Sequence, residues 1–288
     1  RYGRRHRLRA RLVHIAGNGP EPAATSDPVG GQTAPMLFGR LDPVGSPGVV
    51  MTAPRLPGEE LNRVVLRSTT RDVPAEGLAA RHLLPPRSTQ VEVERHGAID
   101  DAVGRPDVTR YGDLATRDAY TLHLDPRSQV DPAAVDPDDE GAARFVPIGT
   151  PLGVDHLPDP LARRLQLRTK EGSILPGAIV SGIPIGGRFW PEATSVLLVV
   201  EEADSFSVDY DEANSKLVVR LPKATTLPLR LSSVFDREDL TRFGLAEWIA
   251  RKVIPNAPDW PRSVEDLAAT PLGQRIVDGL NWTFTPWQ

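Results

Sequence analysis

The chain has 288 residues and a formal net charge of −4, with 34 Lys and Arg against 38 Asp and Glu. This balance offers no basic field to collect phosphates, so we expect no nucleic acid among its partners. The absence of cysteine excludes disulfides, thiolate metal ligands and cysteine nucleophiles in this chain. Apolar runs are far shorter than the ~18 residues of a membrane helix, so we expect no transmembrane segment. The 29 prolines and 24 glycines favour turns over long helices.

The first strand-like pattern lies at residues 7–15. Leu8, Ala10 and Leu12 alternate there with arginines, as in a strand with one apolar face. The pattern runs into Ala-Gly-Asn-Gly-Pro at residues 16–20, which stops a strand. No strand-like pattern precedes it that could be its partner. We therefore predict that residues 1–19 are the terminal strand of an upstream β-sandwich-like domain, and that the chain is a piece of a larger protein.

Residues 20–60 are dominated by Gly, Pro, Ala and small polar residues, which predicts an extended linker. Within it, residues 36–41 and 49–52 have the pattern of short strands. After the linker, short alternating patterns predict strands at residues 64–66, 90–94 and 120–124.

The C-terminal half carries clearer strand signals. We predict strands at residues 165–167, 196–200, 206–210, 217–221 and 227–231. The segment 196–200 is continuously apolar, which is typical of a strand buried on both faces. Residues 211–215 read as a hairpin loop. Together these strands predict an antiparallel meander.

Helical patterns follow the strands. Ser233 or Asp236 can cap a helix that reaches about Val253. A second helix is expected from Thr270, with Pro271 at its first position. The predicted fold class is β-rich (α+β): residues 61–288 form an irregular antiparallel β-domain with two or three C-terminal helices.

One acidic stretch is a candidate metal site. Asp136, Asp138 and Glu140 place carboxylates at alternate positions before Gly141, as in the first half of a calcium loop. An EF-hand also needs Glu at the twelfth position, which here is Pro147. The stretch is therefore a looser calcium site or a solvated acidic loop, and no other cofactor is expected.

All five tryptophans lie beyond residue 165. Trp248 lies on the apolar stripe of a predicted helix and is assigned to the core. Trp260, Trp282 and Trp287 are candidates for an interaction surface. They can pack against a neighbouring domain, or form a platform for a sugar or a peptide.

A search for catalytic motifs finds no Gly-x-Ser-x-Gly elbow, no His-Glu-x-x-His and no phosphate-binding loop. Ser232 and Ser233 follow a strand, where a turn or capping role fits them. His82, His96 and His123 could meet only through the fold. The sequence therefore assigns no catalytic residue.

The opening strand resembles the penultimate strand of fibronectin type III and immunoglobulin-like sandwiches. The residues that carry this resemblance are Leu8, Arg9, Ala10, Arg11, Val13, Ala16, Gly17 and Asn18. The remainder resembles a segment of very large uncharacterised bacterial proteins, some of which accompany phage-tail-like contractile injection systems. The segments that carry this second resemblance are residues 81–86, 94–97, 157–162 and 229–233.

The interrupted chain, the β-sandwich-like opening, the many turns and the lack of a catalytic motif together predict a non-enzymatic structural or protein-interaction segment of a large multidomain bacterial protein. Such a protein would be secreted, surface-bound or part of a particle. Its partners would be other domains of the same polypeptide or other protein subunits. Two alternatives stay open: a hydrolase domain with an acidic or metal-assisted site, and a carbohydrate- or peptide-binding module.

Overall fold

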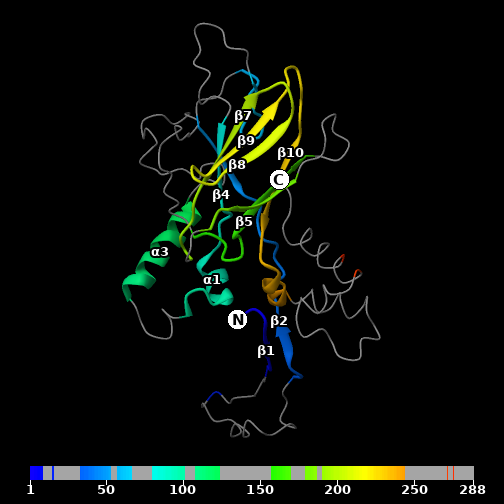
Figure 1. The fold of residues 1–288 in the computed structure, drawn as a ribbon. Coiled ribbons are helices and arrows are strands. Elements are labelled where there is room, and N and C mark those ends of the chain that lie inside the picture. Colours follow the sequence, from blue (N-terminus) through cyan, green and yellow to red (C-terminus); the bar gives the residue numbers. More distant parts are fainter. Residues whose placement is uncertain are drawn as a thin grey trace. The chain divides into compact units, whose positions relative to one another are not determined.

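The structure is a computed structural model of the chain. It describes residues 1–8, 15, 33–52, 57–66, 80–100, 108–123, 157–169, 179–186, 190–243, 271 and 275. The chain divides into two compact units. Unit 1 comprises Arg1–Asp42 and Arg237–Val277, and unit 2 comprises Pro43–Asp236 and Asp278–Gln288. Figure 1 labels the helices and strands.

Unit 1 contains a two-stranded antiparallel ribbon and a short 3-10 helix. These elements are β1 (Arg4–His6), β2 (Met36–Phe38) and η2 (Arg237–Arg242). Beyond the strands, Leu8 and Thr33 form two hydrogen bonds with each other, so the pairing extends past His6. The amide of Arg40 donates to the carbonyl of Arg242. This bond ties the chain after β2 to the end of η2.

The first strand thus has a partner within this chain, which the sequence analysis did not anticipate. β2 confirms the short strand predicted at residues 36–41. At the ends of the strand predicted at residues 7–15, Arg7 and Leu8 lie outside β1 and Ile15 lies in a turn. Residues 9–14 lie outside the described residues.

The larger sheet of unit 2 has the strand order β3-β4-β7-β9-β8. Its strands are β3 (Gly48–Met51), β4 (Ala80–Leu84), β7 (Val196–Glu202), β8 (Ser207–Asp211) and β9 (Lys216–Leu221). Neighbours are antiparallel except β7 and β9, which run parallel. The connection between these two contains β8, which forms the outer strand beyond β9. The predicted hairpin loop at residues 211–215 is confirmed.

The smaller sheet of unit 2 has the order β10-β5-β6, and all its pairs are antiparallel. Its strands are β5 (Arg164–Thr169), β6 (Ile179–Pro184) and β10 (Leu229–Val234). In β5, Leu165 and Leu167 are fully buried and alternate with partly exposed polar residues, which is the period-two pattern of a half-buried strand. The β5–β6 pairing shifts register between Leu165 and Leu167. Gly182 in β6 has a φ of 82°, a value that glycine adopts without strain.

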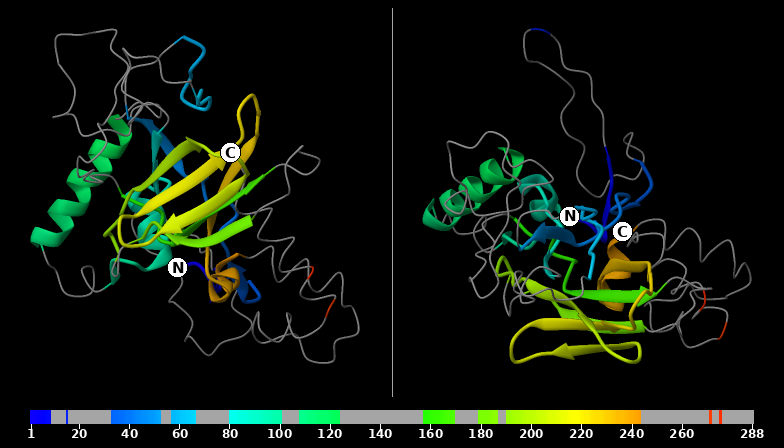
Figure 2. Two further views of the ribbon diagram at one scale, coloured as in Figure 1. Left: turned by 45° about the horizontal axis from the view of Figure 1, so that its top comes forward. Right: turned by 90° about the horizontal axis from the view of Figure 1, so that it is seen from above.

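The two sheets of unit 2, whose ribbons are drawn in Figure 2, share one hydrophobic core according to the contacts of their buried side chains. The smaller sheet and the residues after it contribute Leu165, Leu167, Ile183, Ile185 and Leu231, and the larger sheet contributes Leu83, Val196, Leu198, Val200, Leu217, Val219 and Leu221. Each described strand belongs to one sheet only. Packing of side chains therefore joins the sheets, as in a β-sandwich.

Two helices lie in the middle of the chain, α1 (Gln90–His96) and α3 (Val108–His123). The Thr89 hydroxyl caps α1 by accepting from the amide of Glu92, and Gly97 ends the helix with a φ of 79°. A second, smaller core joins the helices to the chain before β5. It consists of Val93, Ile99, Leu114 and Leu157.

The structure corrects several predicted elements. Residues 90–94 and 120–123, expected in strands, lie in α1 and α3. In α1 the caps and the Glu92–Arg95 ion pair outweigh a short alternating pattern. Residues 64–66 form no strand, and only an isolated bridge joins Glu60 to Arg63 nearby.

The meander is also only partly correct. β8 and β9 form the predicted hairpin, but β9 pairs with β7 in parallel, and β10 joins the smaller sheet. β10 leaves the predicted meander because it belongs to the smaller sheet, from which Leu231 packs into the core that the two sheets share.

The fold is β-rich, with three mostly antiparallel sheets. The two α-helices that the structure describes are in the middle of the chain, not in the predicted C-terminal segment. After Asp236 the described chain forms the 3-10 helix η2, and Pro271 and Arg275 are helical. The rest of the predicted C-terminal helices lies outside the described residues.

Candidate functional site

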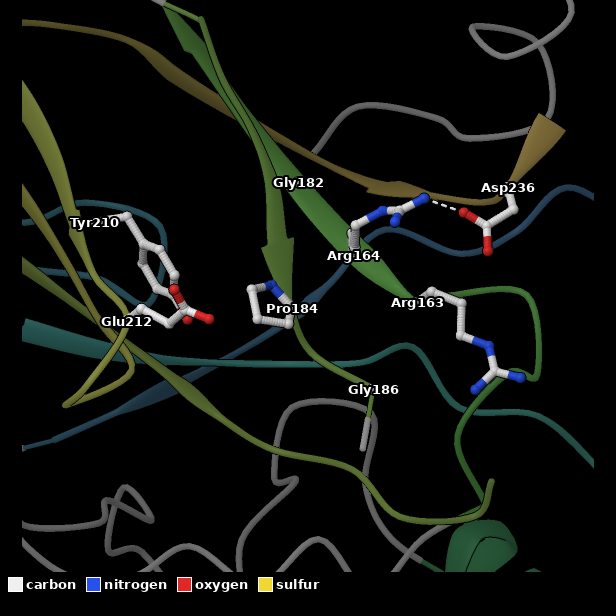
Figure 3. A pocket seen from close by; sticks show the side chains of 8 residues that line it. All are labelled: Arg163, Arg164, Gly182, Pro184, Gly186, Tyr210, Glu212 and Asp236. Carbon is white, nitrogen blue, oxygen red and sulfur yellow. Dashed lines mark hydrogen bonds and ion pairs between the residues drawn. The ribbon is translucent and has the colours of Figure 1, made fainter. Parts of the chain in front are cut away.

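Unit 2 contains an open pocket of about 640 Å³ where the two sheets meet at one side (Figure 3). It lies between β6 and β8, which contact each other. β6 is one of the two outer strands of the smaller sheet, and β8 is one of the two outer strands of the larger sheet. The residues that line it are Arg163, Arg164, Gly182, Pro184, Gly186, Tyr210, Glu212 and Asp236.

The smaller sheet supplies the basic wall of the pocket. The guanidinium of Arg164, at the start of β5, forms an ion pair with Asp236, which follows β10. Arg163 precedes β5, and its carbonyl accepts from the amides of Ile185 and Gly186. Its side chain forms no hydrogen bond or ion pair with another described residue. Arg164 is thus neutralised, whereas the charge of Arg163 has no ion-pair partner in the part of the chain that the structure describes.

Tyr210 and Glu212 form the opposite wall, across Pro184 (Figure 3). Burial raises the pKa of the Tyr210 hydroxyl, the nearby Ser215 hydroxyl opposes this shift, and the charges of Glu212 and Asp211 add to it. The hydroxyl oxygen is shielded from solvent and forms no hydrogen bond of ordinary geometry with a described residue. Tyr210 therefore stays protonated at neutral pH and presents its ring to the pocket. The carboxylate of Glu212 has no ion-pair partner among the described residues.

The β8–β9 hairpin beside the pocket carries two further carboxylates, Asp209 and Asp211, and both already have hydrogen-bond or ion-pair partners. Asp211 accepts hydrogen bonds from the side-chain and backbone nitrogens of Asn214, at 2.6 and 3.3 Å. Both hydrogen bonds lower the pKa of Asp211, and the bond from the side-chain nitrogen of Asn214 has the larger effect. Asp209 forms an ion pair with Arg220. The part of the chain that the structure describes contains no group of three metal-ligating side chains.

Both sets of site residues chosen from the sequence lie outside the described residues. They are the calcium candidates Asp136, Asp138 and Glu140, and the interaction candidates Trp260, Trp282 and Trp287. Both assignments stay predictions.

The two serines that the sequence placed after a strand, in a turn or capping role, lie inside strand β10. Ser232 and Ser233 are buried in β10, and the Ser233 hydroxyl donates to the carbonyl of Gly45 at 2.6 Å. The Ser232 hydroxyl donates to the carbonyl of Ser233 at 3.0 Å. His82 is buried in β4 and His96 in α1.

Unit 1 presents a different surface, here called the ribbon face. In the β1–β2 register, Arg4 lies opposite Phe38 and His6 opposite Met36, so these four side chains share one face. Phe38 stacks on Tyr2 with ring centroids 5.2 Å apart and meets the edge of His6. Even so, Met36 and Phe38 are 47% and 40% exposed.

Comparisons with protein-family models, with curated proteins and with solved structures gave no match. No helix in the described ranges is long and apolar enough to cross a membrane. The geometry alone therefore carries the functional argument. It offers a charged pocket between two outer strands and an exposed apolar ribbon face.

Sequence reasoning missed the pocket residues. Arg163 and Glu212 are 49 positions apart in the sequence printed above, and no motif links them. Of the two strands beside the pocket, β8 was predicted at residues 206–210, but β6 was not. The contact between β6 and β8, which brings the two walls together, was not predicted either.

Proposed function

We propose that this chain is a non-enzymatic structural or protein-interaction segment of a large multidomain bacterial protein that is secreted, surface-bound or part of a phage-tail-like particle. The observation that carries the proposal is the ribbon face, where Met36 and Phe38 are exposed on a two-stranded sheet. Leu41, just after the ribbon, is 65% exposed.

Two physical arguments connect this face to binding. An isolated two-stranded ribbon is only marginally stable in water, so a partner that covers it adds stability. Large apolar side chains grouped on a surface, rather than scattered, are typical of protein contacts. The positively charged side chain of Arg4 beside them favours a partner surface with acidic groups around an apolar centre. Other domains of the same polypeptide or other protein subunits are the proposed partners.

The pocket in unit 2 supports a binding role better than the hydrolase alternative. Its carboxylate Asp236 is held by Arg164, and its tyrosine has a raised pKa, which disfavours the role of a base. The other two charged side chains of the pocket, Arg163 and Glu212, are suited to holding a ligand.

Site-specific photo-crosslinking in cells that make the full-length protein tests this proposal. Benzoylphenylalanine placed at Phe38 should crosslink to another domain or another subunit. The matched control is Val91 of α1, which is also apolar and 52% exposed but stands outside the ribbon face. The proposal is overturned if position 38 crosslinks no more than position 91.

A further inference from the structure

We propose that the pocket between β6 and β8 binds an extended peptide segment that carries one acidic and one basic side chain. The inference rests on unit 2 alone, so it stands or falls separately from the role of the ribbon face.

The position of the pocket favours an extended ligand. β6 and β8 are outer strands of two different sheets, and both border the pocket. The outer side of an edge strand presents backbone groups that an added strand can pair with. A peptide lying here would pair with the edge of one of these two strands.

The charges of the pocket favour a ligand of mixed sign. Arg163 and Glu212 stand on opposite walls, and Pro184 lies between them (Figure 3). Neither side chain has a charged partner among the described residues, whereas Arg164 and Asp236 neutralise each other. The planar guanidinium of Arg163 suits a carboxylate, and the carboxylate of Glu212 suits an ammonium or a guanidinium. A simple anion would be attracted by one wall and repelled by the other.

The shape of the pocket also suits a peptide. Its volume of about 640 Å³ is within the usual range of ligand sites. Gly182 and Gly186 contribute no side chains, and a Cβ at Gly182 would have no atom within 4 Å. The ring of Tyr210 gives the site one apolar surface.

Fluorescence anisotropy with the purified full chain tests the proposal. The probe is a fluorescein-labelled nonapeptide of alternating Val and Thr, in which one Thr is Asp and the Thr four positions later is Lys. These two side chains point to the same face of an extended peptide. The control probe has Thr at both positions. We expect the charged probe to bind more tightly than the neutral one.

Charge reversal identifies the site. Arg163→Glu and Glu212→Lys should each weaken binding of the charged probe by about fivefold or more. The double variant again has one charge of each sign, so it should recover binding with the peptide in the opposite direction. Arg230→Glu and Asp204→Lys reverse charges outside the pocket and should leave binding unchanged. Circular dichroism checks that each variant is folded.

Three results would overturn the proposal. One is equal binding of charged and neutral probes, or no binding of either. Another is binding that neither single variant weakens. The third is a folded double variant that binds no better than the single variants.

Discussion

Arg81 is a charged side chain inside the larger sheet, and its hydrogen bonds explain how β4 tolerates it. It is only 2% exposed. Its guanidinium donates to the carbonyls of Glu60 and Leu61 at 3.0 and 3.2 Å, and to that of Ala80 at 2.7 Å. Burial lowers the pKa of Arg81, and the nearby Glu59 partly offsets this effect. Arg81 thus anchors the turn at residues 60–63 to β4, an interior strand of the sheet.

Replacing this side chain should therefore be costly. Arg81→Met keeps an apolar stem but removes the guanidinium donors to the carbonyls of Glu60, Leu61 and Ala80. It also removes the positive charge near Glu59. We expect a loss of about 3 kcal/mol in the free energy of unfolding, measured by urea denaturation. Arg230→Met, on the partly exposed strand β10, is the control and should change stability by about 0.5 kcal/mol or less. Equal losses in the two variants would show that the anchor contributes nothing.

Among the strands, β4 shows why the sequence predicted only part of the fold. All five residues of β4 are buried, yet Arg81 and His82 give the segment a polar appearance, so no strand was predicted there. β5, β8 and β9 were predicted because their apolar residues alternate. The pairing of these strands depends on long-range packing, which local periodicity does not encode. For the same reason, local sequence patterns could not predict that Arg163 and Glu212 line the same pocket.

The connection between β9 and β10 contains a strained residue. Ala224 has a φ of 55° and is exposed. A left-handed conformation costs an alanine about 1–2 kcal/mol, whereas glycine adopts it freely but loses about 0.5–1 kcal/mol more chain entropy on folding. Ala224→Gly should therefore stabilise the protein by about 0.5–1 kcal/mol in thermal or urea unfolding.

A second alanine provides the control for this substitution. Ala213, in the β8–β9 loop, is exposed and is not among the residues with positive φ. Ala213→Gly should give only the entropic loss and destabilise the protein. A change of the same sign in both variants would mean that the backbone at Ala224 is not strained.

For the molecule as a whole, the decisive question is how the two sheets of unit 2 are joined. Among the described residues, no strand is shared between them, and one core contains side chains from both. The hydrogen bond from Ser233 to the carbonyl of Gly45 is an additional link between β10 and the chain before β3. If the shared core is the main link, the two sheets should lose stability together when it is damaged.

Leu165→Ala tests this cooperativity, because Leu165 is fully buried in the shared core. We expect a loss of about 2–5 kcal/mol, and hydrogen exchange should accelerate by the same factor in β5, β10, β7 and β9. Leu114→Ala, in the smaller core of α1 and α3, is the matched control and should accelerate exchange mainly in the helices. If Leu165→Ala accelerates exchange in β5, β6 and β10 alone, the sheets are separate folding units and the shared core is not what joins them.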